Sequence, residues 1–64
     1  MNIRLTKRLY NENEAAEYLN RSIDAMKKLR YRGLLKFVQI GRRIQYDIND
    51  LNSFIEANKK HIDY

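Results

Sequence analysis

Two segments with helical periodicity are separated by only three residues, and this spacing restricts the possible fold more than any other feature of the chain. The first segment, about Glu12–Leu19, follows Asn11, whose side chain can cap a helix. The second, about Ile23–Arg32, follows Ser22, a favoured N-cap residue. Asn20 lies between them and tolerates the left-handed backbone angles that end a helix. The sequence therefore predicts two short helices joined by a tight turn.

Both predicted helices have an apolar face, and these faces should meet in a small core. The residues expected there are Ala15, Tyr18, Leu19, Ile23, Met26 and Leu29, together with Tyr10 and Tyr46. Arg30 also falls near the apolar stripe of the second helix, where the local sequence does not account for a charged side chain.

A hairpin should follow the second helix. Gly33 is expected to end that helix, and apolar and polar residues then alternate on both sides of Gly41. This pattern predicts two antiparallel strands, which must pack on the helices because two strands alone are unstable in water. The side chains predicted to face the core are Val38, Ile40, Ile44 and Tyr46, and those predicted to face water or a ligand are Gln39, Arg42, Arg43 and Gln45.

A third amphipathic helix of about residues 48–59 is predicted after the hairpin. We expect residues 1–9 and 60–64 to be loose ends. The 64 residues show no repeat or linker, so one domain over residues 1–64 is expected, of the α+β class and mostly helical.

Positive charge is concentrated in the middle of the chain. Residues 25–46, called here the basic zone, hold seven Lys and Arg residues and no acidic residue, whereas the whole chain has a formal net charge of +5. The basic zone comprises the second predicted helix and the hairpin. Such a distribution favours a polyanionic partner.

Several classes of protein are disfavoured by the composition. The absence of cysteine excludes disulfides and thiolate metal sites, and the lone His61 has no second His to share a metal. We find no nucleophile paired with a base and no glycine-rich phosphate loop, so neither an enzyme nor a cofactor is expected. No apolar run suits a membrane span or a signal peptide, and a cytoplasmic protein is expected.

Two helices joined by a tight turn, followed by a basic hairpin and a packing helix, together form a winged helix-turn-helix. The chain resembles the excisionase-type helix-turn-helix proteins, which are related to the DNA-binding domain of MerR regulators. The resemblance covers about Tyr10 to Ile55 and is carried by "NEAAEYL", by the segment from Ser22 to Gly33, by "VQIGRR" and by "DLNSFI". It implies DNA binding, with the second helix in the major groove and the hairpin, or wing, against the backbone or minor groove.

Transferred residue by residue, the resemblance gives a candidate DNA-binding set. The set comprises Ser22, Ile23, Asp24, Ala25, Lys27, Lys28, Tyr31 and Arg32 of the second helix and Gln39, Arg42, Arg43 and Gln45 of the wing. Simpler interpretations stay open: Ser22 is also a helix cap, Asp24 a partner of the helix dipole, and Lys27, Lys28 and Arg32 could form only a solvated face.

Two functions follow from this interpretation. One is a double-stranded DNA binder, either an excisionase (a recombination directionality factor) or a transcriptional regulator of a mobile genetic element, with copies associating side by side on DNA. The other is a non-catalytic accessory subunit that binds an integrase or a replication enzyme, or that holds single-stranded DNA. The second is motivated by Ile23, Asp24, Ala25 and Tyr31, which give the second helix an unusually apolar and partly acidic face.

Overall fold

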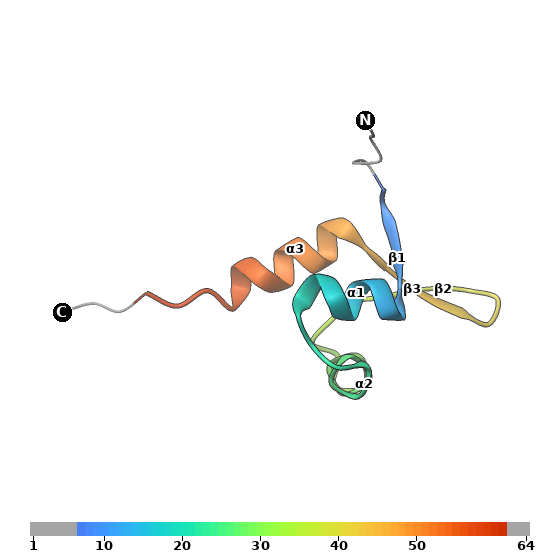
Figure 1. Ribbon diagram of the computed structural model, residues 1–64, viewed down its shortest axis with the longest axis horizontal. Coiled ribbons are helices and arrows are strands. Elements are labelled where there is room, and N and C mark those ends of the chain that lie inside the picture. The colour runs from blue at the N-terminus through green and yellow to red at the C-terminus, as the bar shows by residue number, and fades with distance from the viewer. Residues whose placement is uncertain (1–6, 62–64) are drawn as a thin grey trace.

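The computed structural model describes residues 7–61, which form three short helices and a small antiparallel sheet (Figure 1). This is the expected α+β fold, compatible with a winged helix-turn-helix. In chain order the elements are β1 (Leu9–Asn11), α1 (Glu12–Leu19), α2 (Ile23–Tyr31), β2 (Val38–Ile40), β3 (Arg43–Asp47) and α3 (Ile48–Ala57).

The helix boundaries follow from capping groups that the sequence provides. Asn11 caps α1 as expected, in a capping box with Glu14, and Asn20 ends that helix at a φ of 57°. The Ser22 hydroxyl accepts a hydrogen bond from the amide of Ala25 at 3.1 Å. Because these capping bonds are local, the start of each helix is the predicted one. Helix α1 also ends as predicted, whereas α2 ends one residue and α3 two residues earlier than expected.

The sheet has three strands, in the order β1-β3-β2, where the sequence predicted two. Leu9 pairs with Asp47, and the carbonyl of Arg8 accepts a hydrogen bond from the amide of Ile48 at 2.8 Å. The expectation of a loose start is therefore wrong from Arg8 onward. At the other end, Lys60 and His61 are exposed and belong to no helix or strand. Residues 1–6 and 62–64 of the predicted loose ends lie outside the described residues.

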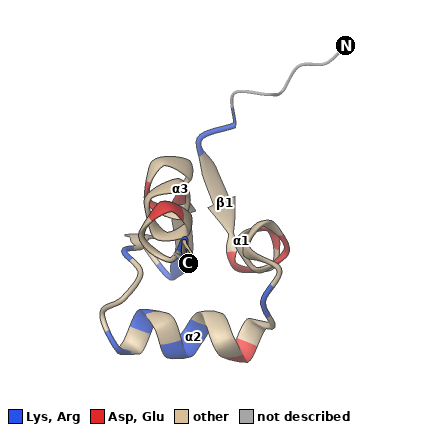
Figure 2. Cartoon of the chain, turned by 90° about the vertical axis from the view of Figure 1, so that its left-hand side faces the viewer, with Lys and Arg blue, Asp and Glu red and all other residues tan. Residues whose placement is uncertain are grey.

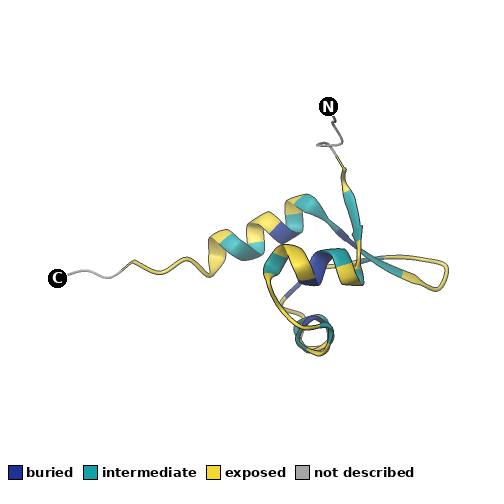
Figure 3. Ribbon diagram, viewed as in Figure 1, coloured by how far each residue is buried: buried dark blue, intermediate teal, exposed yellow. Residues whose placement is uncertain are grey.

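The core lies where α1, α2 and α3 meet the sheet (Figure 3). Its buried side chains are Ala15, Ala16, Met26, Leu35, Tyr46 and Leu51. Tyr10, Leu19, Ile23 and Leu29 are partly buried against them, as expected. The core position predicted for Tyr18 is wrong, because this side chain is 41% exposed, with its ring tilted against Tyr10 and its hydroxyl donating to Asn52.

The register of the hairpin corrects the prediction of its two faces. The paired residues are Val38 with Gln45, Gln39 with Ile44 and Ile40 with Arg43. Since the turn contains two residues, each even-numbered residue of β2 lies opposite an odd-numbered residue of β3. Directly opposed side chains share a face, so the even-numbered apolar residues of the two strands lie on opposite faces.

Ile44 and Tyr46 face the core as predicted, whereas Val38 and Ile40 do not. Ile40 is 57% exposed on the outer face of the sheet. Gln45, predicted to face outward, shares that outer face, while Gln39 lies on the face of Ile44.

Candidate nucleic-acid interface

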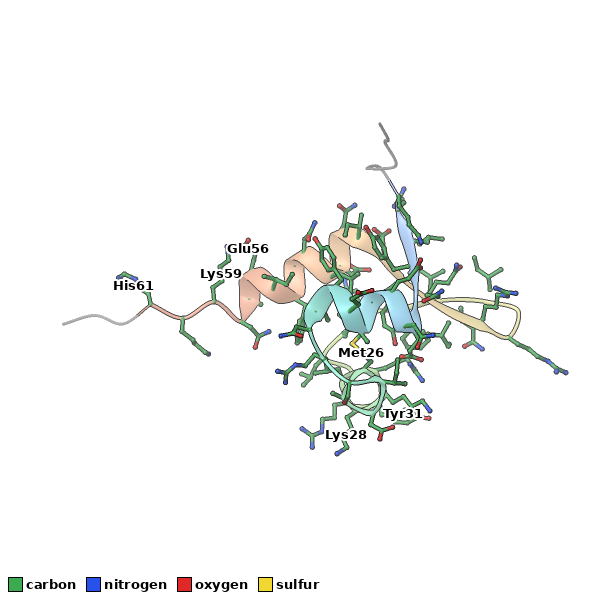
Figure 4. All side chains as sticks on the ribbon, in the orientation of Figure 1. Met26, Lys28, Tyr31, Glu56, Lys59 and His61 are labelled. Atoms are coloured by element: carbon green, nitrogen blue, oxygen red, sulfur yellow. The ribbon has the colours of Figure 1, made fainter. Side chains whose placement is uncertain are left out.

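Helix α2 is attached to the rest of the protein by one side only. Met26 is fully buried and points toward α1, whereas Lys28 and Tyr31 point away from the protein (Figure 4). Ile23 and Ala25 of the candidate set are half-buried at the flanks, and Ile23 packs against the core. The exposed members on α2 and its two caps are Ser22, Asp24, Lys27, Lys28, Tyr31 and Arg32. The outward face of α2 is therefore mainly basic, with an acidic residue in its first turn.

The hairpin of β2 and β3, called the wing from here on, projects away from the helices (Figure 1). Its turn places Gly41 at a φ of +63°, a conformation that L-residues rarely adopt, with Arg42 and Arg43 exposed beside it. Gln39 is exposed and its amide donates to the carbonyl of Gly41 at 3.3 Å, whereas Gln45 is half-buried. The two arginines thus lie at the tip of the wing, Arg42 in the turn and Arg43 at the start of β3.

Most cations of the basic zone are left without an ion pair. Among residues 7–61, the salt bridges join Lys7 to Glu14, Arg8 to Asp47, Arg30 to Glu12, and Lys59 to Glu56. Only Arg30 of these belongs to the basic zone. The six other cations there, Lys27, Lys28, Arg32, Lys36, Arg42 and Arg43, are all exposed. In Figure 2 the cartoon of α2 is blue, the colour of Lys and Arg, at several places along its length, and red, the colour of Asp and Glu, near one end. Asp24 is the acidic residue in the first turn of α2.

Arg30 has a structural role that the sequence analysis did not assign. Its guanidinium donates to the Glu12 carboxylate and to the Tyr46 hydroxyl, both at 2.7 Å, and that hydroxyl donates to Glu12 at 2.6 Å. The Arg30 side chain is 11% exposed. Burial and the hydrogen bond to Glu12 raise the pKa of Tyr46 to about 12. One polar network therefore joins α1, α2 and β3. The signal in the sequence is Arg30 near the apolar stripe of its helix, because a buried charge requires a partner.

Two aromatic rings flank Arg30 at the corner between α2 and the wing. The guanidinium carbon lies 5.5 Å from the centre of the Tyr31 ring and 5.7 Å from that of Phe37. Tyr31 is nevertheless 80% exposed and Phe37 is 42% exposed. The cation–π contact thus holds an aromatic surface beside the unpaired cations of α2.

A family model described as Helix-turn-helix domain matches residues 9–59. The chain belongs to this family. No curated protein and no solved structure matches the chain. Within this helix-turn-helix protein, the match covers every described helix and strand, and membership supports a small DNA-binding protein.

Other kinds of site receive no support from the described residues. Across residues 7–61, no three His, Cys, Asp or Glu side chains come together as a possible metal site. No described helix has the length and apolar character needed to cross a membrane. The candidate functional site of the helix-turn-helix protein is the exposed basic face of α2 and the wing, because the exposed cations of the basic zone without an ion pair among residues 7–61 lie mainly there.

Proposed function

We propose that the helix-turn-helix protein binds double-stranded DNA, with α2 in the major groove and the wing tip against the phosphate backbone. The observation that carries this proposal is the set of six exposed cations in the basic zone that form no ion pair within residues 7–61. Each is available to neutralise a phosphate and release a counterion. A helix fits the roughly 12 Å wide major groove, where the edges of all four base pairs differ.

Within this binding mode the candidate residues have different roles. Lys27, Lys28 and Arg32 contact phosphates beside the groove, and Arg42 and Arg43 do so from the wing. Ser22 caps α2, so the amides of its first turn lie near the end of the helix that attracts anions. Asp24 is exposed in that same turn and suits the amino group of cytosine, the base-edge donor that a carboxylate accepts from.

We further propose that the protein acts as an excisionase or as a transcriptional regulator of a mobile genetic element. This role follows from the sequence resemblance, and the small size of the protein supports a binding mode with adjacent copies. A single module of this kind buries only roughly 600–1,000 Å² on DNA, so tight binding requires copies side by side on neighbouring sites.

The test is the salt dependence of DNA binding, measured by fluorescence anisotropy with random duplex and single-stranded oligonucleotides of equal length. We expect a preference for duplex and a logarithm of affinity that falls linearly with the logarithm of salt concentration. Replacing Arg42 and Arg43 with Ala should reduce that slope by about 2, since each lost phosphate contact removes about 1. The matched control is Lys60→Ala, an exposed cation outside the basic zone. An unchanged slope in the wing variant would contradict the proposed contact.

A second candidate function is supported by Tyr31. Tyr31 is 80% exposed, and aromatic side chains of this kind stack on unpaired bases. An accessory protein that holds single-stranded DNA for an integrase or a replication enzyme would use this surface. The same titration separates the two functions, because preference for the single strand, abolished by Tyr31→Ala, would favour the accessory role.

A further inference from the structure

A groove lies between α2 and α3, on the flank of α2 away from the wing. The wing side of α2 is defined by Arg30, which bonds to Tyr46 of β3, whereas Ala25 and Leu29 face α3. The groove encloses about 650 Å³. Its apolar lining residues are Leu19, Ala25, Leu29, Phe54 and Ile55.

The apolar surface continues along α3 into a second hollow of about 430 Å³. Leu29 and Phe54 line both hollows, so the two form one continuous surface. The second also includes Leu34, which is 58% exposed in the loop before β2. The hollows together offer a long apolar floor, the shape that accommodates one face of an amphipathic helix.

The rim of the first groove is positively charged. Arg21, Lys28 and Lys59 lie on it, and none of the described residues that line it is acidic. Lys59 pairs with Glu56 at 2.9 Å, but both side chains are more than 60% exposed, and such a pair contributes little. The ammonium of Lys59 can therefore exchange this partner for another carboxylate. The second hollow carries one charge of each sign, Lys36 and Asp50.

We propose that this groove binds an acidic amphipathic helix of a protein partner. The apolar residues of that helix lie on Leu29 and Phe54, and its carboxylates reach the three cations of the rim. The charge complementarity selects an acidic occupant, and the apolar floor selects an amphipathic one. DNA also attracts the cations but has no apolar face to cover the floor. The inference goes beyond DNA binding and does not depend on which DNA-linked role the protein has.

The proposal places the partner beside the DNA. Lys28 belongs to both surfaces, whereas Arg21 and Lys59 lie outside the candidate DNA-binding set. Variants of Arg21 or Lys59 therefore separate partner binding from DNA binding. Lys60 provides a matched control, since it is adjacent to Lys59, carries the same charge and does not line the groove.

The probe is a fluorescein-labelled synthetic peptide with Leu at helical spacing on one face and Glu on the other. A scrambled peptide of the same composition is its control. Binding is measured by anisotropy with the whole 64-residue chain, and the contact surface is mapped through the methyl resonances of Leu19, Ala25 and Ile55. We expect saturable binding of the amphipathic peptide alone and shifts confined to the groove.

Charge reversal then tests the rim. Lys59→Glu should weaken peptide binding at least fivefold, and Lys60→Glu less than twofold, while neither changes duplex affinity as Lys28→Glu would. Equal losses in the two variants would overturn the proposal, because they would indicate general charge attraction. The proposal would also be overturned if the peptide failed to bind, or if the shifts were confined to the outward face of α2 and the wing. A self-associated protein with the groove already covered by a second copy would overturn it as well. Duplex affinity is read in the same samples, so the failure of one proposal is distinguishable from the failure of the other.

Discussion

Replacing Arg30 with Met should destabilise the protein far more than any other loss of a cation from α2. The substitution keeps the length of the side chain and its apolar contacts but removes the donor to Glu12 and Tyr46. The Glu12 carboxylate would then keep only the Tyr46 hydroxyl as a donor from the network. A partly buried charge without its counter-charge is the cause of the expected loss.

The magnitude follows from the burial of the pair. Exposed ion pairs contribute about 0–1 kcal/mol, and removing one partner of a fully buried pair costs about 3–5 kcal/mol. The side chains of Arg30 and Glu12 are 11% and 21% exposed, close to the buried case, so we expect a loss of about 2–3 kcal/mol. A chain of 64 residues has a total stability on the order of 3–10 kcal/mol. The Arg30→Met protein is therefore expected to fold, with a much lower urea midpoint.

A double-mutant cycle provides the assay. Urea unfolding is measured for Arg30→Met, for Glu12→Gln and for the double variant, with Arg32→Met as the matched control on the exposed side of α2. The control should change the free energy of unfolding by less than about 0.5 kcal/mol. The double variant should lose less than Arg30→Met alone, because it leaves no partly buried charge unpaired. Additive losses from the two single variants, or a control as damaging as Arg30→Met, would refute this reasoning.

Three further outcomes are expected from local features. The pKa of Asp47 lies below its usual 3.8 because the carboxylate accepts hydrogen bonds from the Asn49 amide and from Arg8. The stability that this carboxylate contributes is present above pH 3.8 and is lost as the pH falls through its pKa in the folded protein. Asp47→Asn should therefore flatten the acid limb of a curve of stability against pH. Asn20 adopts a φ of 57°, so Asn20→Gly should be nearly neutral in thermal unfolding and Asn20→Ala should cost about 1 kcal/mol; equal melting temperatures would contradict this. Ile40→Thr, on the outer face of the sheet, should change the free energy of unfolding by less than about 0.5 kcal/mol, and a core-like loss of over 1 kcal/mol would contradict the register.

The sequence was most informative where the determining contacts are local. The capping box of Asn11, the left-handed Asn20 and the Ser22 cap each act within a few residues, and the predicted start of every helix agrees with the structure. The strand at Leu9 could not be predicted in the same way, because its hydrogen bonds go to β3, nearly forty residues away along the chain.

The candidate site also contains features that depend on local sequence and features that depend on distant residues. The exposure of Lys28 and Tyr31 follows from the helical period once Met26 is assigned to the core. The orientation of the wing residues depends on whether the turn has two or three residues, and alternation alone does not decide this. The partner of Arg30 lies on another helix, so a misplaced charge was visible in the sequence but its counter-charge was not.

Strand β3 continues into α3 with no intervening loop, and Asp47 serves as the last residue of the strand and as the cap of the helix. On the side of β3 the wing therefore has no loop at its base, and Arg30 ties α2 to the same strand through Tyr46. If α2 and the wing bind DNA as proposed, this connection would reduce the entropic cost of ordering the interface on binding. Under the proposed binding mode, a duplex whose groove does not match the spacing between α2 and the wing tip would itself have to bend or change its groove width. Selection among sites would then depend on the deformability of the DNA as well as on its base edges.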